Sequence, residues 1–302
     1  MALLPILESD APTVHLSHLD DLWFQITGTL CNLACRHCFI SCSPRNDRFG
    51  FISRKDVERA LAESVRLGVK EYYFTGGEPF LHPELVPIVC RTLELGPVTI
   101  LTNATLLRDD WLRELACAEA NSPYSLEFRV SLDSFDPASN DAIRGQGVFA
   151  RTLRGIRQLL EHGFLPIITV AHVDESISPH ELFFRFVEML KAHGYSRPRV
   201  KILPLLRIGA EAVRGRPYQP DERVTPEMLH DFNLDQLLCR HARVVTDRGV
   251  YVCPILLEAE DARLGEDLSS GLGGFALRYQ ACYTCYLHGA ICANASEQQR
   301  DW

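Results

Sequence analysis

The chain has 302 residues, of which 46% are hydrophobic and 23% charged, as in an ordinary globular protein with a substantial core. Its formal net charge of −8 argues against a surface that binds nucleic acid. No stretch approaches the roughly 20 apolar residues of a membrane span, and residues 1–10 lack the features of a signal peptide. We therefore expect a cytoplasmic protein with neither nucleic acid nor membrane as a partner.

The middle of the chain alternates strand-like and helix-like segments, which predicts a parallel sheet with helices outside it. The expected strands cover residues 21–27, 71–74, 98–102, 126–132, 165–173 and 200–203. The expected helices cover residues 53–67, 85–95, 109–119, 148–162 and 179–193. Six strands are too few for a complete eight-stranded barrel, so we expect an α/β fold in the form of a partial (β/α)6 barrel. Ligands of such folds bind at the carboxyl ends of the strands.

The pattern changes after the last of these strands, where a segment rich in glycine and proline begins. A helix near residues 226–238 and a hairpin that turns at residues 247–249 are expected beyond it. We therefore divide the chain into an N-terminal extension at 1–20, the barrel at 21–205 and a small C-terminal domain at 206–302.

Eleven cysteines are unusual for a chain that we expect in the reducing cytosol, where disulfides are disfavoured. Four of them lie between Cys31 and Cys42, and five lie between Cys239 and Cys292. Two separate groups of thiols predict two metal sites. The remaining Cys90 and Cys117 fall on expected helices and fit as small core residues.

The first group has the spacing Cys31-x3-Cys35-x2-Cys38, directly after the first expected strand. Three thiolates on one short loop can hold three irons of a cubane cluster and leave the fourth iron open to a substrate or cofactor. Zinc is the alternative, because Cys42 or His37 could complete a set of four ligands.

This loop resembles the CxxxCxxC signature of the radical S-adenosylmethionine (SAM) superfamily. Further segments at strand ends resemble motifs of the same superfamily, including its GGE motif and the "SLD…IRG" stretch of the subgroup with sulfatase-maturing and peptide-modifying enzymes. The matching segments are residues 31–38, 76–79, 101–103, 131–133 and 143–145.

The resemblance implies that the three thiolates bind a [4Fe–4S] cluster, whose open iron chelates the methionine part of SAM. Backbone groups of Gly76 and Gly77, together with Glu78, would position the amino group of SAM. Ser131 and Arg144 would hold its carboxylate, which suits the planar fork of a guanidinium.

Other residues receive roles from the same resemblance. Asn103 would contact the ribose, and His37 stands where the family often has an aromatic residue near the adenine. Cys42 could donate a hydrogen atom to a product radical. The implied reaction is one-electron cleavage of SAM to methionine and a 5′-deoxyadenosyl radical, which abstracts hydrogen from a substrate. An external donor such as flavodoxin or ferredoxin would supply the electron.

The second group, Cys239, Cys253, Cys282, Cys285 and Cys292, resembles the region called SPASM, or its shorter form called twitch. Five cysteines suffice for one auxiliary [4Fe–4S] cluster, with the first four as preferred ligands and Cys292 as a substitute. Such a cluster would transfer electrons, or bind substrate directly if one iron is open. Two separated cysteine pairs are also a zinc-ribbon pattern, so zinc is the alternative.

Several substrate classes fit this sequence. The chain begins almost directly at the first expected strand, so we expect no N-terminal peptide-recognition domain. A compact core with one auxiliary cluster is similar to enzymes that act on sugars and nucleosides in natural-product pathways, and we favour that class. Modification of a ribosomal peptide, by epimerisation or crosslinking, comes second. A non-catalytic iron–sulfur electron carrier and a zinc-stabilised interaction protein are the alternatives from other classes.

Overall fold

The computed structural model describes residues 10–289, in which nine strands form one sheet and two more form a separate pair. The order across the large sheet is β10–β9–β8–β2–β3–β4–β5–β6–β7, and β2 to β7 are parallel neighbours in chain order. These six are β2 (Asp21–Gln25), β3 (Glu71–Thr75), β4 (Val98–Thr102), β5 (Leu126–Ser131), β6 (Ile167–Ala171) and β7 (Arg199–Leu203). The expected α/β fold with six βα repeats and an open barrel is confirmed.

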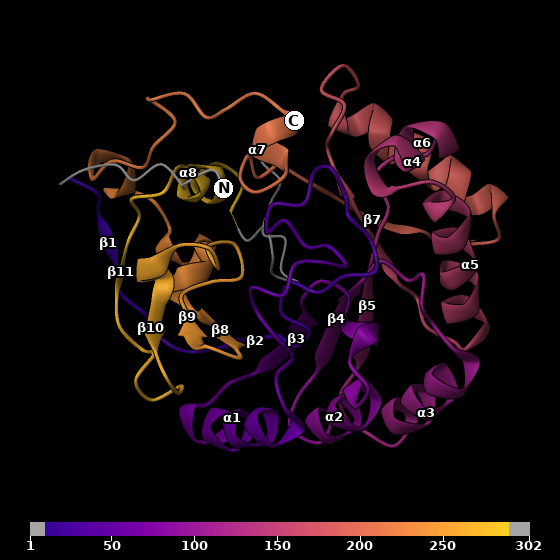
Figure 1. The fold of residues 1–302 in the computed structure, drawn as a ribbon, viewed down its shortest axis with the longest axis horizontal. Helices are drawn as coiled ribbons and strands as arrows, with labels where there is room; N and C mark the ends of the chain where they lie inside the picture. The colour runs from indigo at the N-terminus through magenta and orange to yellow at the C-terminus, as the bar shows by residue number, and fades with distance from the viewer. Residues whose placement is uncertain (1–9, 290–302) are drawn as a thin grey trace.

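Helices follow the strands along the outer side of the barrel, as Figure 1 shows for α1, α2, α3 and α5. They are α1 (Arg54–Leu67), α2 (Leu85–Thr92), α3 (Asp109–Ala120), α4 (Pro137–Arg144), α5 (Val148–Glu161) and α6 (Pro179–Ala192). Helix α1 begins where the Ser53 side chain accepts a hydrogen bond from the Asp56 amide. It ends at Gly68, whose positive φ of 78° suits a glycine C-cap.

The two faces of the parallel sheet differ in character. Successive side chains of a strand point to opposite faces. Phe24 and Phe74 stack on the face that packs against the helices, in the main apolar core. Trp23 and Tyr73 stack on the opposite, concave face with ring centroids 4.2 Å apart. The guanidinium of Arg129 lies 5.6 Å from the Tyr73 ring centre, so the concave face combines aromatic and charged groups.

The C-terminal part of the chain continues the same sheet. Strand β8 (Ala242–Thr246) pairs in parallel with β2, and β9 (Gly249–Tyr251) and β10 (Arg263–Gly265) extend the sheet by antiparallel pairing. The expected hairpin is therefore present. Near the N-terminus, β1 (Thr13–Val14) pairs with β11 (Phe275–Ala276). The division into extension, barrel and C-terminal domain stays a prediction.

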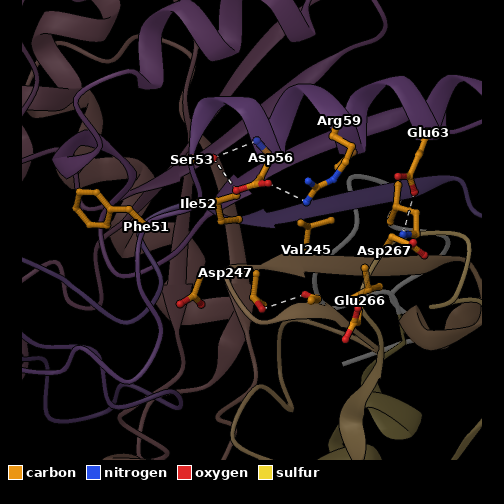
Figure 2. A pocket seen from close by; sticks show the side chains of 15 residues that line it. Phe51, Ile52, Ser53, Asp56, Arg59, Glu63, Val245, Asp247, Glu266 and Asp267 are labelled. Atoms are coloured by element: carbon orange, nitrogen blue, oxygen red, sulfur yellow. Dashed lines mark hydrogen bonds and ion pairs between the residues drawn. The ribbon is translucent and has the colours of Figure 1, made fainter.

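A polar groove lies between α1 and the β8–β9 hairpin (Figure 2). Its acidic side chains have partners: Asp56 pairs with Arg59 at 2.8 Å, and Asp247 accepts a hydrogen bond from the Gly50 amide at 2.8 Å. Glu63 accepts one from the Leu268 amide at 3.1 Å. The Asp247 contact joins the hairpin turn to the segment before α1, and the Glu63 contact joins α1 to the segment after β10.

The expected helix at residues 226–238 is wrong. Short 3-10 helices, Glu227–Leu229, Leu234–Gln236 and Leu238–Arg240, occupy the segment. Asn233 interrupts it because its side chain accepts a hydrogen bond from the Asp235 amide and starts a new turn. Helix α7 (Glu211–Arg214) precedes this segment, and the 3-10 helix Glu260–Ala262 and α8 (Gln280–His288) follow it. No helix within residues 10–289 is long and apolar enough to cross a membrane.

Candidate active site

The first thiols lie on the loop that leaves the carboxyl end of β2. Cys31 is buried, and Cys35 and Cys38 are half-buried. Backbone amides point at the sulfurs: the Leu33 amide donates to Cys31 Sγ at 3.4 Å, and the Cys42 amide donates to Cys38 Sγ at 3.3 Å. Such amide donors suit the sulfur ligands of an iron–sulfur cluster, because they stabilise negative charge on sulfur.

The chemistry of these thiols fits a metal cluster. Burial raises the pKa of Cys31 to about 12 and that of Cys35 to about 11, and the neighbouring thiolates add to the rise. A hydrogen bond from the Cys42 side chain lowers the pKa of Cys38 to about 6. Three crowded thiolates repel one another unless a cation stands between them, and a bound metal removes that penalty.

The glycines after β3 allow the backbone to approach this loop. A Cβ atom on Gly77 would lie 1.9 Å from the Leu30 carbonyl oxygen and 2.7 Å from the Cys31 amide nitrogen. Gly76 has a φ of 148°, and a Cβ there would lie 2.3 Å from Thr27 Oγ1. The Gly-Gly turn therefore packs backbone to backbone against the cysteine loop, which explains why these positions hold glycine.

Gly77→Ala is expected to lower iron content several-fold and the free energy of unfolding by about 1–3 kcal/mol, because the added methyl displaces the Cys31 backbone. The checks are iron analysis after anaerobic reconstitution and denaturant unfolding. Gly273→Ala is the matched control, since a Cβ at Gly273 meets no atom within 4 Å. Equal iron content in the two variants would contradict the close approach.

Glu78 is fully buried at the start of the 3-10 helix Pro79–Leu81, between the ends of β3 and β4. Its Oε1 accepts hydrogen bonds from Thr102 Oγ1 at 2.6 Å and from the Phe80 amide at 3.2 Å. Its Oε2 accepts one from the Asn103 amide at 2.8 Å. Burial raises the pKa of Glu78 to about 7, although these donors oppose the rise. The carboxyl group is held in one position.

Asn103 connects the end of β4 to the cysteine loop. Its Nδ2 donates to Asn32 Oδ1 at 2.9 Å and lies 3.9 Å from Cys31 Sγ. Its Oδ1 accepts hydrogen bonds from the amide and the hydroxyl of Thr105. The Asn103 side chain is thereby fixed beside the first thiol.

Asp133 follows β5 and joins two of the sequence-predicted residues. It is buried, and its Oδ2 lies 2.5 Å from Arg144 Nε and 2.9 Å from His37 Nε2. Its Oδ1 accepts a hydrogen bond from the Ala171 amide. Burial opposes ionisation, yet Arg144 and His37 hold the pKa of Asp133 well below its usual range. Ser131 is the last residue of β5. Because His37 lies on the cysteine loop, its contact with Asp133 places this cluster of charges beside that loop.

The second thiols converge on one apolar cavity. Cys239 precedes β8, Cys253 follows β9, and Cys282 and Cys285 lie on α8. All four line the cavity together with apolar side chains, and all four are buried. Burial, reinforced by the neighbouring Cys285, raises the pKa of Cys253 to about 12. Cys292 lies outside the described residues.

The described residues contain no ready-made site for a single metal ion. Within residues 10–289, no three Cys, His, Asp or Glu side chains are placed to ligate one ion. In a cubane, by contrast, each thiolate binds a different iron.

A family comparison decides the identity of the fold. The sequence model of the Radical SAM superfamily matches residues 26–187, which is more than half of the chain. The chain belongs to the radical SAM superfamily. The resemblance noted in the barrel segments is confirmed, and with it the enzyme class and the cofactors of this family, a [4Fe–4S] cluster and SAM.

Individual radical SAM relatives have low sequence identity to this chain. The GTP 3′,8-cyclase of Tolumonas auensis is 27% identical over 185 residues, which are 59% of this chain and 51% of that protein. The mycofactocin maturase MftC of Mycobacterium ulcerans is 30% identical over 135 residues, 44% of this chain and 35% of that protein. This chain thus spans about half the length, or less, of these curated relatives.

Solved structures share the fold. SuiB of Streptococcus suis bound to S-adenosylmethionine has a TM-score of 0.62 at 19% identity, over 81% of this chain and 62% of that one. Native anSMEcpe with bound AdoMet has a TM-score of 0.58 at 16% identity, over 83% of this chain and 80% of that one.

Two contacts of this radical SAM core were not expected from sequence. The segment after β7 packs on the cysteine loop, where the Ala210 amide donates to the Cys38 carbonyl at 2.9 Å. Gly209, with a φ of 60°, allows this approach, because a Cβ there would lie 2.3 Å from the Phe39 carbonyl oxygen. The glycine at position 209 is the only sequence feature that could have indicated this close approach. Because the segment around it is irregular, the sequence does not show that its partner is the cysteine loop. The second is the ion pair of Asp133 with His37.

Proposed function

We propose that this chain cleaves SAM reductively at a [4Fe–4S] cluster held by Cys31, Cys35 and Cys38, and abstracts hydrogen from a polar small molecule. The observation that carries the proposal is the placement of these thiols beside the fully buried Glu78 at the carboxyl ends of adjacent parallel strands. When bound, the cluster and SAM supply a 5′-deoxyadenosyl radical.

The chain's own residues would bind and orient SAM. Glu78 would accept a hydrogen bond from the amino group of SAM, with the backbone of Gly76 and Gly77 beside it. Arg144 and Ser131 would hold the carboxylate. The contact between Asp133 and the Arg144 Nε supports this role, because it fixes the guanidinium plane before SAM binds.

Asn103 and His37 would contact the rest of the cofactor, the ribose and the adenine side respectively. The fixed geometry of Asn103 beside Cys31 supports its role. Cys42 is a candidate hydrogen-atom donor. Normal turnover by the Cys42→Ala variant would contradict that role. An external donor of the flavodoxin or ferredoxin type would reduce the cluster.

The second thiols would bind one auxiliary [4Fe–4S] cluster in a SPASM- or twitch-like region. Cys239 lies at the amino end of β8, whereas Cys31 lies beyond the carboxyl end of the neighbouring parallel strand β2. A five-residue strand spans about 16 Å. This separation supports electron transfer rather than direct binding of the reacting substrate.

Replacing Cys239, Cys253, Cys282 and Cys285 together by alanine is expected to remove about four of about eight irons per chain and to leave slow formation of 5′-deoxyadenosine intact, because only the auxiliary cluster loses its ligands. Iron and sulfide analysis, followed by incubation with SAM and dithionite, checks both. Cys90→Ala, on α2, is the control and should retain all the iron. If the unaltered chain binds only about four irons, it holds a single cluster, and the proposed auxiliary cluster is contradicted.

A nucleoside- or sugar-type substrate is supported by one matched relative, which is, by its name, a cyclase of GTP. Peptide modification is the alternative, supported by the similarity to MftC and to the fold of SuiB bound to its precursor peptide SuiA.

The experiment is an anaerobic screen of the reconstituted, reduced chain with SAM. Nucleosides, nucleotides, sugars and synthetic peptides are offered separately, and 5′-deoxyadenosine is quantified by mass spectrometry. Stimulation by nucleosides or sugars supports the proposal, and transfer of deuterium from the substrate into 5′-deoxyadenosine identifies the abstracted hydrogen. If only peptides stimulate the reaction, the substrate is a peptide and not a nucleoside or sugar. If no sample contains 5′-deoxyadenosine, the proposed cleavage of SAM is contradicted.

A further inference from the structure

Arg243 is a charged side chain that none of the preceding roles uses. It lies on β8 and is completely buried. Its Nε donates to the Gly271 carbonyl at 2.7 Å, and its Nη2 donates to the Gly273 carbonyl at 2.7 Å. Its Nη1 donates to the carbonyls of Cys239 at 2.9 Å and Ala242 at 2.7 Å. The guanidinium is therefore enclosed by backbone oxygens.

These oxygens satisfy the hydrogen bonds of Arg243 but do not neutralise its charge. Among residues 10–289, no carboxylate forms an ion pair with this guanidinium, although the structure contains many such pairs elsewhere. A guanidinium is not deprotonated in proteins, so this side chain carries its positive charge into the interior. A buried charge without a counter-charge is costly, and proteins seldom keep one.

The groups that could supply a counter-charge are the second group of thiols. Arg243 is joined to Cys239 directly through the Cys239 carbonyl, and the Cys239 thiol lines one cavity with those of Cys253, Cys282 and Cys285. Four thiolates around a [4Fe–4S] cluster give the whole assembly a net negative charge, which increases by one when the cluster is reduced. The partner that the buried cation lacks would therefore be present when the cluster is bound.

We propose that Arg243 is the counter-charge of the auxiliary cluster and a positioning residue for it. This inference rests on the auxiliary cluster of the proposed function. A fixed positive charge favours the reduced cluster over the oxidised one, so Arg243 raises the reduction potential. Its hydrogen bonds also tie Cys239 to the turn at residues 271–273.

The turn is itself held firmly against the hairpin. A Cβ on Gly271 would lie 2.5 Å from Val250 Cγ1, so the Gly271 backbone contacts β9 directly. Arg243 thus connects the strand that follows Cys239 to a segment packed on the strand that precedes Cys253. Positioning and charge are two separable consequences of one side chain.

The test uses the full chain with Cys31, Cys35 and Cys38 replaced by alanine, so that the auxiliary cluster alone contributes signals. Arg243→Gln and Arg243→Lys are introduced into this parent, and Arg263→Gln is the control because Arg263 is an exposed arginine on β10. Midpoint potentials are measured by titration followed by electron paramagnetic resonance. Iron content is measured in each variant.

Arg243→Gln should lower the equilibrium constant for reduction at least tenfold, about 59 mV for one electron, while Arg243→Lys and Arg263→Gln stay within threefold of the parent. An unchanged potential in Arg243→Gln would overturn the inference, as would equal shifts in the glutamine and lysine variants. Arg243→Gln could bind no iron at all. In that case, an Arg243→Lys variant that keeps its iron and its potential supports the role of Arg243 as a counter-charge. Loss of iron from both variants overturns that role. A parent without a cluster overturns the auxiliary cluster itself, which is a distinguishable outcome.

Discussion

Cys35→Ala is expected to abolish formation of 5′-deoxyadenosine from SAM and to remove about four irons per chain, the whole of the first cluster. The loop offers three thiolates for a cubane, and two of them cannot keep it in place while leaving one iron open. Burial and the neighbouring Cys38 raise the pKa of Cys35, which a bound metal reverses by stabilising the thiolate.

The matched control is Cys117→Ala, which removes a thiol from α3. The expectation that Cys117 is a core residue is wrong, because its side chain is exposed. It should retain both the iron and the cleavage of SAM. The readouts are iron and sulfide content and the amount of 5′-deoxyadenosine after reduction with dithionite. Full iron content in Cys35→Ala, or cleavage at the unaltered rate, would contradict the assignment of the first cluster to this loop.

Asp133→Asn is expected to destabilise the chain by about 3–5 kcal/mol, the usual cost of removing one partner of a buried ion pair. Arg144 would remain buried without its carboxylate, and His37 would lose its acceptor. Asparagine has nearly the same shape as aspartate, so the substitution leaves no cavity. The loss of stability therefore measures the effect of removing the negative charge. We also expect weaker binding of SAM, because the Arg144 guanidinium would no longer be fixed.

Denaturant unfolding and a SAM-binding titration of the reconstituted chain measure these two effects. Asp110→Asn is the control, since Asp110 is an exposed aspartate paired with Arg108 at 2.6 Å. Exposed pairs of this kind contribute little to stability. If Asp133→Asn unfolds at the same denaturant concentration as the control, Asp133 is not the counter-charge of Arg144.

Local patterns explain which parts of the fold could be predicted. The parallel strands β2 to β7 were predictable because each combines an apolar run with a following helix, as in residues 71–92. The Cys31 loop and the Gly-Gly turn were predictable because spacing within a short segment limits which groups can meet. The predicted hairpin around Asp247 depends on the same local information.

Contacts between distant segments were not predictable in this way. Strand β8 pairs with β2, yet Ala242 and Asp21 are more than two hundred residues apart and nothing in either strand specifies the other. The contact between His37 and Asp133 has the same origin, since only the folded sheet brings the ends of β2 and β5 together. Arg243 was visible as a charge in an apolar strand, but two of its four carbonyl partners, Gly271 and Gly273, lie 28 and 30 residues further along the chain.

The most direct test of the SAM site is electron–nuclear double resonance of the reduced chain with SAM labelled at its amino nitrogen. An open iron on the Cys31–Cys38 loop should bind that nitrogen, and the spectrum should then show a nitrogen coupling that changes with the isotope. The coupling should disappear in Cys35→Ala together with the cluster. A reduced [4Fe–4S] signal whose spectrum is unaffected by labelled SAM would contradict the account.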